Sequence, residues 1–198
     1  MGQARIEVAP AGQDQLSALA SLFGRAFVDE PMMRWPLGEQ ADIVDRFTRC
    51  FAYFLEEALG LGIVWETAGG KGAAVWIRPD RSEAWVEHPW NQPRIKALSD
   101  DGGLRYDAFW DWVYSHSPDE PLWQLDSIAV EPAYQGRGFG AALIDDGLAR
   151  AQAERAGAFL STGTPRNVSI YGRCGFRVVE EGDAPNGGPH IWFMRWDP

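Results

Sequence analysis

The residues of this 198-residue chain that are best suited to chemistry lie around a glycine-rich stretch, Gln135-Gly136-Arg137-Gly138-Phe139-Gly140-Ala141. It follows a strand-like run, Leu125–Val130, that must end before Pro132 because proline cannot donate to a strand ladder. Glycines let backbone N–H groups approach an anion, and the helix expected next leaves its first N–H groups unpaired. The stretch therefore predicts a phosphate or pyrophosphate site, although an ordinary strand-to-helix turn has the same residue pattern.

Two other nucleotide sites fit less well. A phosphate loop of the Walker type needs a Gly-Lys-Ser/Thr sequence, and no lysine stands near the glycines. A dinucleotide fingerprint is formally satisfied by Gly136, Gly138 and Ala141, but it expects an acidic residue after the next strand. That strand, Phe159–Thr162, is followed by Gly163 and Thr164 instead. A nucleotide-dependent oxidoreductase is therefore disfavoured.

Two motifs together resemble a known family. Gln-Gly-Arg-Gly-Phe-Gly after a strand ending Ile-Ala-Val-Glu-Pro resembles the acyl-CoA loop of the GNAT superfamily of N-acyltransferases, and Asn167 with Tyr171, Gly175 and Phe176 resembles its Asn…Tyr-x-x-x-Gly-Phe signature. The resemblance is strongest over Pro121–Trp196. Within the superfamily, the chain is most similar to puromycin N-acetyltransferase and its relatives, a likeness of scaffold that extends to 26–31, 72–76 and 158–167.

The resemblance implies that acetyl-CoA is the cofactor. Backbone groups of Ile128, Ala129 and Val130 would pair with the pantetheine arm, and Asn167 would contact that arm or cap the following helix. The pyrophosphate would be held by the N–H groups of the glycine loop, which are those of Gln135, Gly136, Arg137, Gly138, Phe139, Gly140 and Ala141. The Arg137 guanidinium would add charge or remain solvated.

The same resemblance makes Tyr171 the general acid, with simple packing on Phe176 as the alternative. The general base is less defined, because the strand position where several family branches carry glutamate is Gln124. Asp126, two residues on and on the same side of the strand, and Glu30, beside the first helix, are the candidates. A water relay and the three histidines, His88, His116 and His190, are weaker alternatives.

The composition is that of a globular protein with a core of its own, so we expect one domain over residues 1–198. The net charge of −10 disfavours a nucleic-acid partner and suits a cationic amine, although solvated surface carboxylates also explain it. No apolar run is long enough to cross a membrane, and two distant cysteines, Cys50 and Cys174, suggest reduced thiols and a cytoplasmic location. No metal site is expected, and a monomer and a homodimer are equally open.

Alternating and helical patterns predict an α/β (α+β) fold. Strands are expected at 5–9, 62–67, 72–77, 125–130, 159–162, 176–180 and 191–195, with a Gly69-Gly70 hairpin turn between the second and third. Helices are expected at 14–28 with Asp14 as the cap, at 42–59, at 104–115, from the glycine loop to about 156, and at 168–174. Met32–Pro36 is expected to be an apolar loop over a pocket or against the core, and Arg78–Ser99 is not assigned. The family resemblance adds a single-domain, curved mixed sheet flanked by helices that splays beside the glycine loop.

These observations predict an acetyl-CoA-dependent N-acetyltransferase whose acceptor is a primary amine of an unidentified small molecule or peptide. A non-catalytic acyl-CoA-binding or regulatory module on the same scaffold is the alternative, because Gln124 cannot take a proton as a strand glutamate would.

Overall fold

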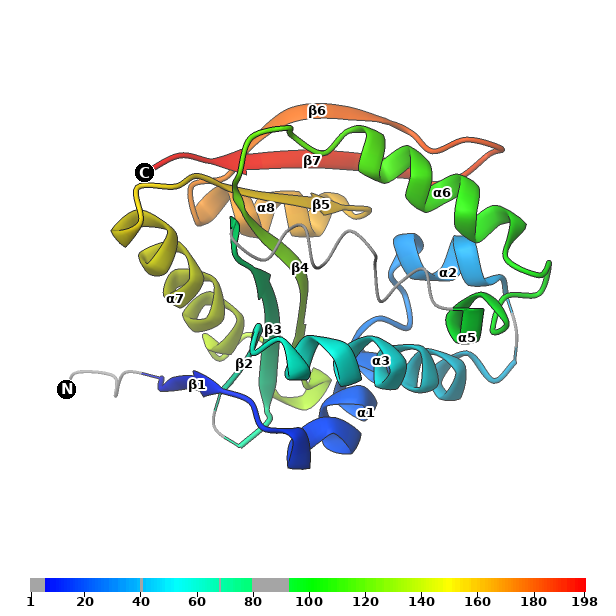
Figure 1. Ribbon diagram of the computed structural model, residues 1–198, viewed down its shortest axis with the longest axis horizontal. Helices are drawn as coiled ribbons and strands as arrows, with labels where there is room; N and C mark the ends of the chain where they lie inside the picture. Colours follow the sequence, from blue (N-terminus) through cyan, green and yellow to red (C-terminus); the bar gives the residue numbers. More distant parts are fainter. Residues whose placement is uncertain (1–5, 40, 68, 80–92) are drawn as a thin grey trace.

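The strand before the glycine loop, β4 (Trp123–Val130), lies at the centre of a seven-stranded sheet (Figure 1). The computed structural model describes residues 6–39, 41–67, 69–79 and 93–198. The strand order is β1-β2-β3-β4-β5-β7-β6, and β4 and β5 are parallel while every other neighbouring pair is antiparallel. The remaining strands are β1 (Val8–Pro10), β2 (Val64–Thr67), β3 (Gly72–Ile77), β5 (Ala158–Thr162), β6 (Arg177–Asp183) and β7 (His190–Trp196).

The sheet opens between β4 and β5. Only Trp123 with Ala158 and Gln124 with Phe159 are paired across these two strands. Beyond them β4 continues along β3, and β5 continues along β7. The mixed sheet and its splay confirm the predicted fold class.

A β-bulge lies in β4 at the same level. Ser127 pairs with Val75 and Leu125 pairs with Trp76, so Asp126 is the extra residue of β4 between them. Bulges change the direction of side chains and are frequent beside active sites. Asp126 therefore lies at the point where the strand is bent next to the opening of the sheet.

Helices cover both faces of the β2–β4 region. In Figure 1, α7 lies on one side of β3 and β4, and α1 and α3 lie on the other; α1 packs on β4 and α3 packs on α1. The helices are η1 (Gln13–Gln15), α1 (Leu16–Ala26), α2 (Pro31–Leu37), α3 (Ile43–Gly60), α5 (Pro93–Lys96), α6 (Leu104–Ser115), η4 (Pro132–Tyr134), α7 (Phe139–Ala153) and α8 (Pro165–Arg173).

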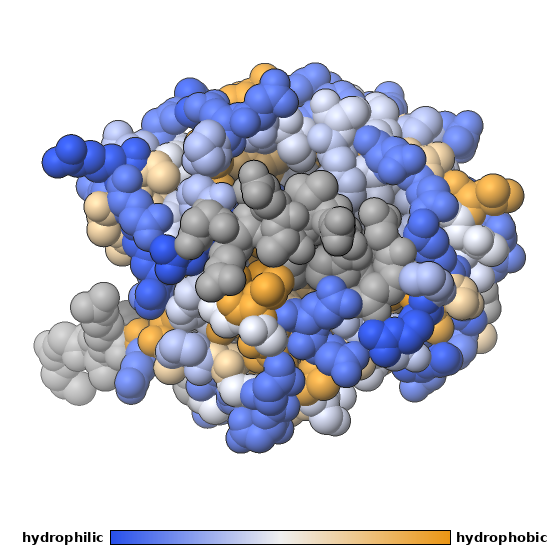
Figure 2. Space-filling view, viewed as in Figure 1, coloured by the Kyte–Doolittle hydropathy of each residue, from blue (hydrophilic) through white to orange (hydrophobic). Residues whose placement is uncertain are grey.

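The core is rich in aromatic side chains. Phe23 of α1 packs on Phe51 of α3 with ring centroids 4.9 Å apart, and every residue of β3 is buried. Trp76 of β3 lies against α7, where its Nε1 donates to the carbonyl of Leu143 at 3.2 Å. On the face drawn in Figure 2, hydrophilic residues cover most of the rim and hydrophobic residues are seen toward the middle. No helix within the described ranges is both long and apolar enough for a membrane span.

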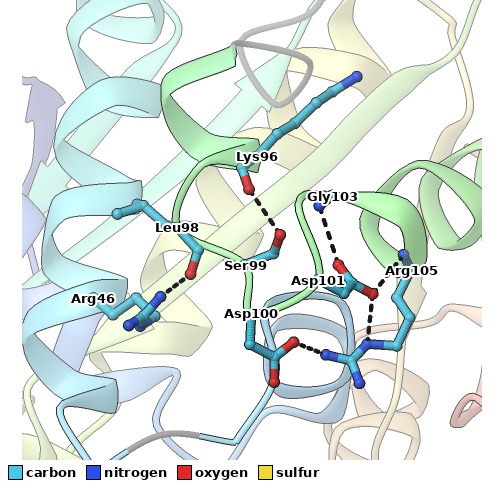
Figure 3. A network of polar contacts seen from close by, with 8 residues as sticks. All are labelled: Arg46, Lys96, Leu98, Ser99, Asp100, Asp101, Gly103 and Arg105. Atoms are coloured by element: carbon cyan, nitrogen blue, oxygen red, sulfur yellow. Dashed lines mark hydrogen bonds and ion pairs between the residues drawn. The ribbon is translucent and has the colours of Figure 1, made fainter.

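Helix α6 is joined to α3 by a network of polar contacts (Figure 3). Arg46 of α3 donates to the carbonyl of Leu98, and Arg105 of α6 contacts both Asp100 and Asp101. Asp101 also accepts from the backbone N–H groups of Gly103 and Arg105, both at 3.1 Å. The start of α6 is thereby held in place, and this matters because α6 lines the cleft described below.

Three local predictions were wrong. Met32–Pro36 belongs to a helix, α2, because Pro31 occupies its first position, where proline needs no hydrogen-bond partner. Asp14 does not cap α1, since it lies inside η1. Helix α8 begins at Pro165 rather than near Val168, and its N-cap is Thr164, whose side chain accepts from the Asn167 N–H at 3.4 Å, so Asn167 is not the cap.

Candidate active site

A cleft of about 810 Å³ lies where β4 and β5 separate. Its walls come from the ends of both strands, the glycine loop, the α1–α2 turn, α6 and α8. Candidate site residues predicted from the sequence line this cleft, and they come from four segments that are distant in the sequence. They are Glu30, Asp126, the loop from Gln135 to Ala141 without Arg137, and Asn167 with Tyr171.

The glycine loop has the backbone geometry of an anion cradle. Gly136 and Gly138 have φ angles of 74° and 91°, in the left-handed region that favours glycine. Gly138 is the N-cap of α7 and provides no capping side chain, so the first N–H groups of that helix have no intrahelical partner. These N–H groups, with the positive end of the α7 dipole, suit a phosphate.

Arg137 lies apart from the cradle. Its side chain is exposed and its guanidinium sits 4.9 Å from the centre of the Tyr134 ring, outside the cleft lining. The side chain of Gln135 instead turns back and donates to the Val130 carbonyl at 3.3 Å. The loop is thus joined directly to the end of β4.

The end of β4 offers an open edge to the cleft. Ile128, Ala129 and Val130 line the cleft and pair with β3 on one side only, since the described pairing with β5 ends at Gln124. Backbone groups on the open side of a strand can pair with an extended ligand as an added strand does.

Tyr171 lies in the last turn of α8, almost fully buried at 8% exposure, and lines the cleft. Its ring packs edge-on against Phe176 at 6.1 Å, so the packing role holds in addition to its place in the cleft. Burial raises the pKa of Tyr171 well above its usual value, and the nearby charges of Glu30 and Cys174 raise it further. Its hydroxyl therefore keeps its proton at neutral pH. Asn167, one helical turn earlier, also lines the cleft.

Glu30 is the N-cap residue of α2 and faces the cleft from the other side. Its Oε1 is buried, and no donor among the described residues reaches this oxygen with normal hydrogen-bond geometry, although the N–H groups of Gly163 and Met32 face the carboxylate. Burial raises the pKa of Glu30 to about 7, while the backbone N–H groups of Gly163 and Met32 partly oppose that shift. A carboxylate that titrates near neutrality is suited to take a proton from an ammonium group.

The other candidate base, Asp126, also lines the cleft, as does Gln124. Asp126 accepts a hydrogen bond from the Ser127 hydroxyl at 2.9 Å. Its charge, with that of Asp111, adds to burial in raising the pKa of Tyr114 of α6.

The histidines take no part in the described lining of the cleft. His116 stacks on Phe193 at 4.8 Å, and His190 hydrogen-bonds Asp183 at 2.7 Å. His88 lies outside the described residues.

An apolar and aromatic part of the cleft lining comes from Met32 and Met33 of α2 and from Trp110 and Tyr114 of α6. The sequence offered Met32–Pro36 as a segment over a pocket, although as a loop, whereas the contribution of α6 was not found. Pro31 at a first helical position was the available signal for α2. The contribution of α6 had no local signal, because helices α2 and α6 meet only through long-range packing.

Comparisons with known proteins agree with this architecture. The model of the Acetyltransferase (GNAT) family matches residues 76–176, about half of the chain. The histone acetyltransferase HPA2 and related acetyltransferase of Corynebacterium glutamicum superimposes with a TM-score of 0.72 at 22% identity, covering 98% of this chain and 97% of the other. The Drosophila melanogaster polyamine N-acetyltransferase, which forms N-acetylagmatine, gives 0.59 at 13% identity over 98% and 100%. The NatC complex bound to Gag peptide and CoA gives 0.54 at 14% identity over 98% and 99%.

Proposed function

Because the chain belongs to the Acetyltransferase (GNAT) family, we propose that it transfers an acetyl group from acetyl-CoA to a primary amine of a small molecule or peptide. One observation carries the proposal: Glu30 and Tyr171, a carboxyl group that titrates near neutrality and a buried phenol, face one cleft beside the anion cradle. Such a pair suits a reaction in which one proton is removed and another is supplied.

The residues present fit the cofactor. Free N–H groups at the start of α7 match a pyrophosphate, and the open edge of Ile128–Val130 matches the amide-containing pantetheine arm. Among the structural neighbours, the NatC complex is bound to CoA. When bound, acetyl-CoA supplies an activated thioester carbonyl and a thiolate leaving group. Asn167 would then contact the arm, and Arg137, at the outer side of the loop, would meet phosphate groups.

In the proposed reaction, Glu30 is the general base and Tyr171 the general acid. Glu30 takes a proton from the acceptor ammonium and passes it to solvent, which leaves a neutral amine to attack the carbonyl carbon. As the C–N bond forms and the C–S bond breaks, Tyr171 gives its proton to the sulfur. The second proton lost by the nitrogen replaces the one that Tyr171 gave. A backbone N–H of β4 near Val130 would polarise the carbonyl.

The acceptor side of the cleft favours an amine with an apolar body. Glu30 and Asp126 contribute two carboxyl groups to the cleft lining, while Met33, Trp110 and Tyr114 provide an apolar and aromatic surface. The Drosophila neighbour acts on a polyamine-type substrate, which is also cationic. The finer resemblance to puromycin N-acetyltransferases remains a prediction drawn from three short stretches of sequence.

We expect thiol release from acetyl-CoA when the protein meets a suitable amine, and Tyr171→Phe to lower kcat about 100-fold because the leaving sulfur loses its acid. The assay uses 2-phenylethylamine, agmatine, spermidine and a short peptide with a free N-terminus as acceptors. The dissociation constant of acetyl-CoA, measured by calorimetry, should change less than about twofold, since the cradle is untouched.

Two outcomes contradict this account. An unchanged kcat in Tyr171→Phe removes the acid assignment. If the protein binds acetyl-CoA but releases no thiol from it with any of the acceptors, the non-catalytic acyl-CoA-binding module is favoured.

A further inference from the structure

Gly163 lies against Glu30, in the segment that leads from β5 into α8, the helix of Tyr171. It follows the last residue of β5, Thr162, and precedes Thr164, the N-cap of α8. Figure 1 shows the C-terminal end of β5 directed toward α2. A Cβ atom built on Gly163 would lie 2.9 Å from Glu30 Oε1, 3.1 Å from Met32 Cγ and 3.5 Å from Pro31 Cβ.

Glycine is needed here because of the neighbouring Glu30 side chain and not because of its backbone conformation. The φ angle of Gly163 lies outside the left-handed region, so an alanine could adopt the same backbone conformation. A real Cβ almost never approaches another atom within 3.0 Å, and the first atom it would meet is the tip of the Glu30 side chain. An added methyl group would therefore displace the carboxylate while leaving the fold in place.

We propose that Gly163 is a positioning residue for Glu30. Because glycine has no side chain, the Glu30 carboxylate can lie against the turn between β5 and α8. The same segment of chain leads into the helix of Tyr171, so it positions both the base and the acid. The inference rests on the proposed function, in which Glu30 is the base and Tyr171 the acid. The Gly163 N–H faces the carboxylate and favours its charged form, which links the contact to protonation as well as to position.

Other charged and titratable groups share the cleft with Glu30, and they must stay constant in any test. Those in the described lining are Asp29 beside it, Tyr114 from α6, Asp126 from β4, Tyr134 from η4, and Tyr171, Arg166 and Arg173 from α8. None of these is altered by a substitution at Gly163.

The test is Gly163→Ala, with Gly172→Ala as the matched control. Gly172 lies in α8 and is exposed, and a Cβ added to it would have nothing within 4 Å, so the same methyl group meets no neighbour there. The first readout needs no acceptor: the Glu30 carboxyl carbon, labelled with ¹³C and assigned through its loss in Glu30→Gln, is titrated by NMR. We expect its midpoint near pH 7 to shift in Gly163→Ala and to stay in Gly172→Ala.

The second readout is kcat for thiol release with the most active of the four acceptors, in the wild type, Gly163→Ala, Glu30→Gln and the double variant. A displaced base should lower kcat about tenfold or more in the wild-type background, because small errors in position are costly in catalysis. In the Glu30→Gln background the same change should alter kcat less than about twofold.

The outcomes separate the two claims. An unmoved NMR midpoint, or an equal loss of kcat in both backgrounds, overturns the positioning role of Gly163 while leaving Glu30 as the base. If Glu30→Gln has wild-type kcat, the base assignment in the proposed function fails first.

Discussion

At the scale of single residues, the site depends on the Glu30 carboxyl group, whose burial disfavours its charged form. Glu30 has a buried oxygen that no donor among the described residues reaches with normal hydrogen-bond geometry, and burial raises its pKa to about 7. Buried groups of this kind reduce stability, and they are frequent at catalytic sites because catalysis needs their shifted pKa values. Replacing Glu30 by an uncharged residue should therefore raise stability and lower activity.

We predict that Glu30→Gln is more stable than the wild type at pH 8 but not at pH 4.5. The folded protein holds the Glu30 proton more tightly than the unfolded chain, whose ordinary pKa is 4.5. The stabilisation from this group is thus complete below pH 4.5 and is lost as the pH rises through 7. The difference in free energy of unfolding should reach up to about 3 kcal/mol at pH 8, at about 1.4 kcal/mol for each pH unit between the two pKa values.

Urea unfolding at pH 4.5 and pH 8 measures that difference. Glu181→Gln, at an exposed position of β6, is the control. A Glu30→Gln variant with the same advantage at both pH values would show that Glu30 is not buried as described.

At the scale of elements, packing between α7 and β3 holds the cradle beside β4. The indole of Trp76 is 1% exposed and lies against Gly147 of α7. A Cβ on Gly147 would overlap the indole ring of Trp76, which cannot move away because it is surrounded by core. Glycine is needed there for close approach of helix and strand.

We predict that Gly147→Ala lowers the free energy of unfolding by about 1–2 kcal/mol. Because the added Cβ would overlap the indole ring, we take the upper part of the usual cost of overfilling a packed core, about 2–3 kcal/mol. The gain in helix propensity from replacing glycine by alanine, about 1 kcal/mol, offsets only part of that cost. Urea unfolding compares it with Gly172→Ala, where that gain is expected alone. A Gly147→Ala variant as stable as the wild type would contradict the described packing.

Helices and strands could be predicted from the sequence where a single local residue pattern determined them. The structure has α6 at Leu104–Ser115, as the sequence indicated, and the hairpin of β2 and β3 around Gly69 and Gly70 is also confirmed. Helix α2 was missed because its two prolines resemble loop residues, although proline at a first helical position favours a helix.

At the scale of the whole molecule, the candidate site could be predicted only in pieces. The glycine loop and Tyr171 are visible in the sequence as motifs. That Glu30, 141 positions before Tyr171, faces the same cleft depends on long-range packing, and so does the wall formed by α2 and α6. Local periodicity carries no information on which strands separate, so the splay was implied by the family resemblance alone.

The central claim is that an acyl-CoA binds in the opening of the sheet with its thioester beside Tyr171, while the acceptor amine lies beside Glu30. A crystal structure with bound CoA tests it most directly. We predict the pyrophosphate on the N–H groups of the Gly136–Ala141 segment, the pantetheine arm along Ile128–Val130, and the sulfur within hydrogen-bond distance of the Tyr171 hydroxyl. CoA bound elsewhere, or a sulfur turned away from Tyr171, would contradict the account.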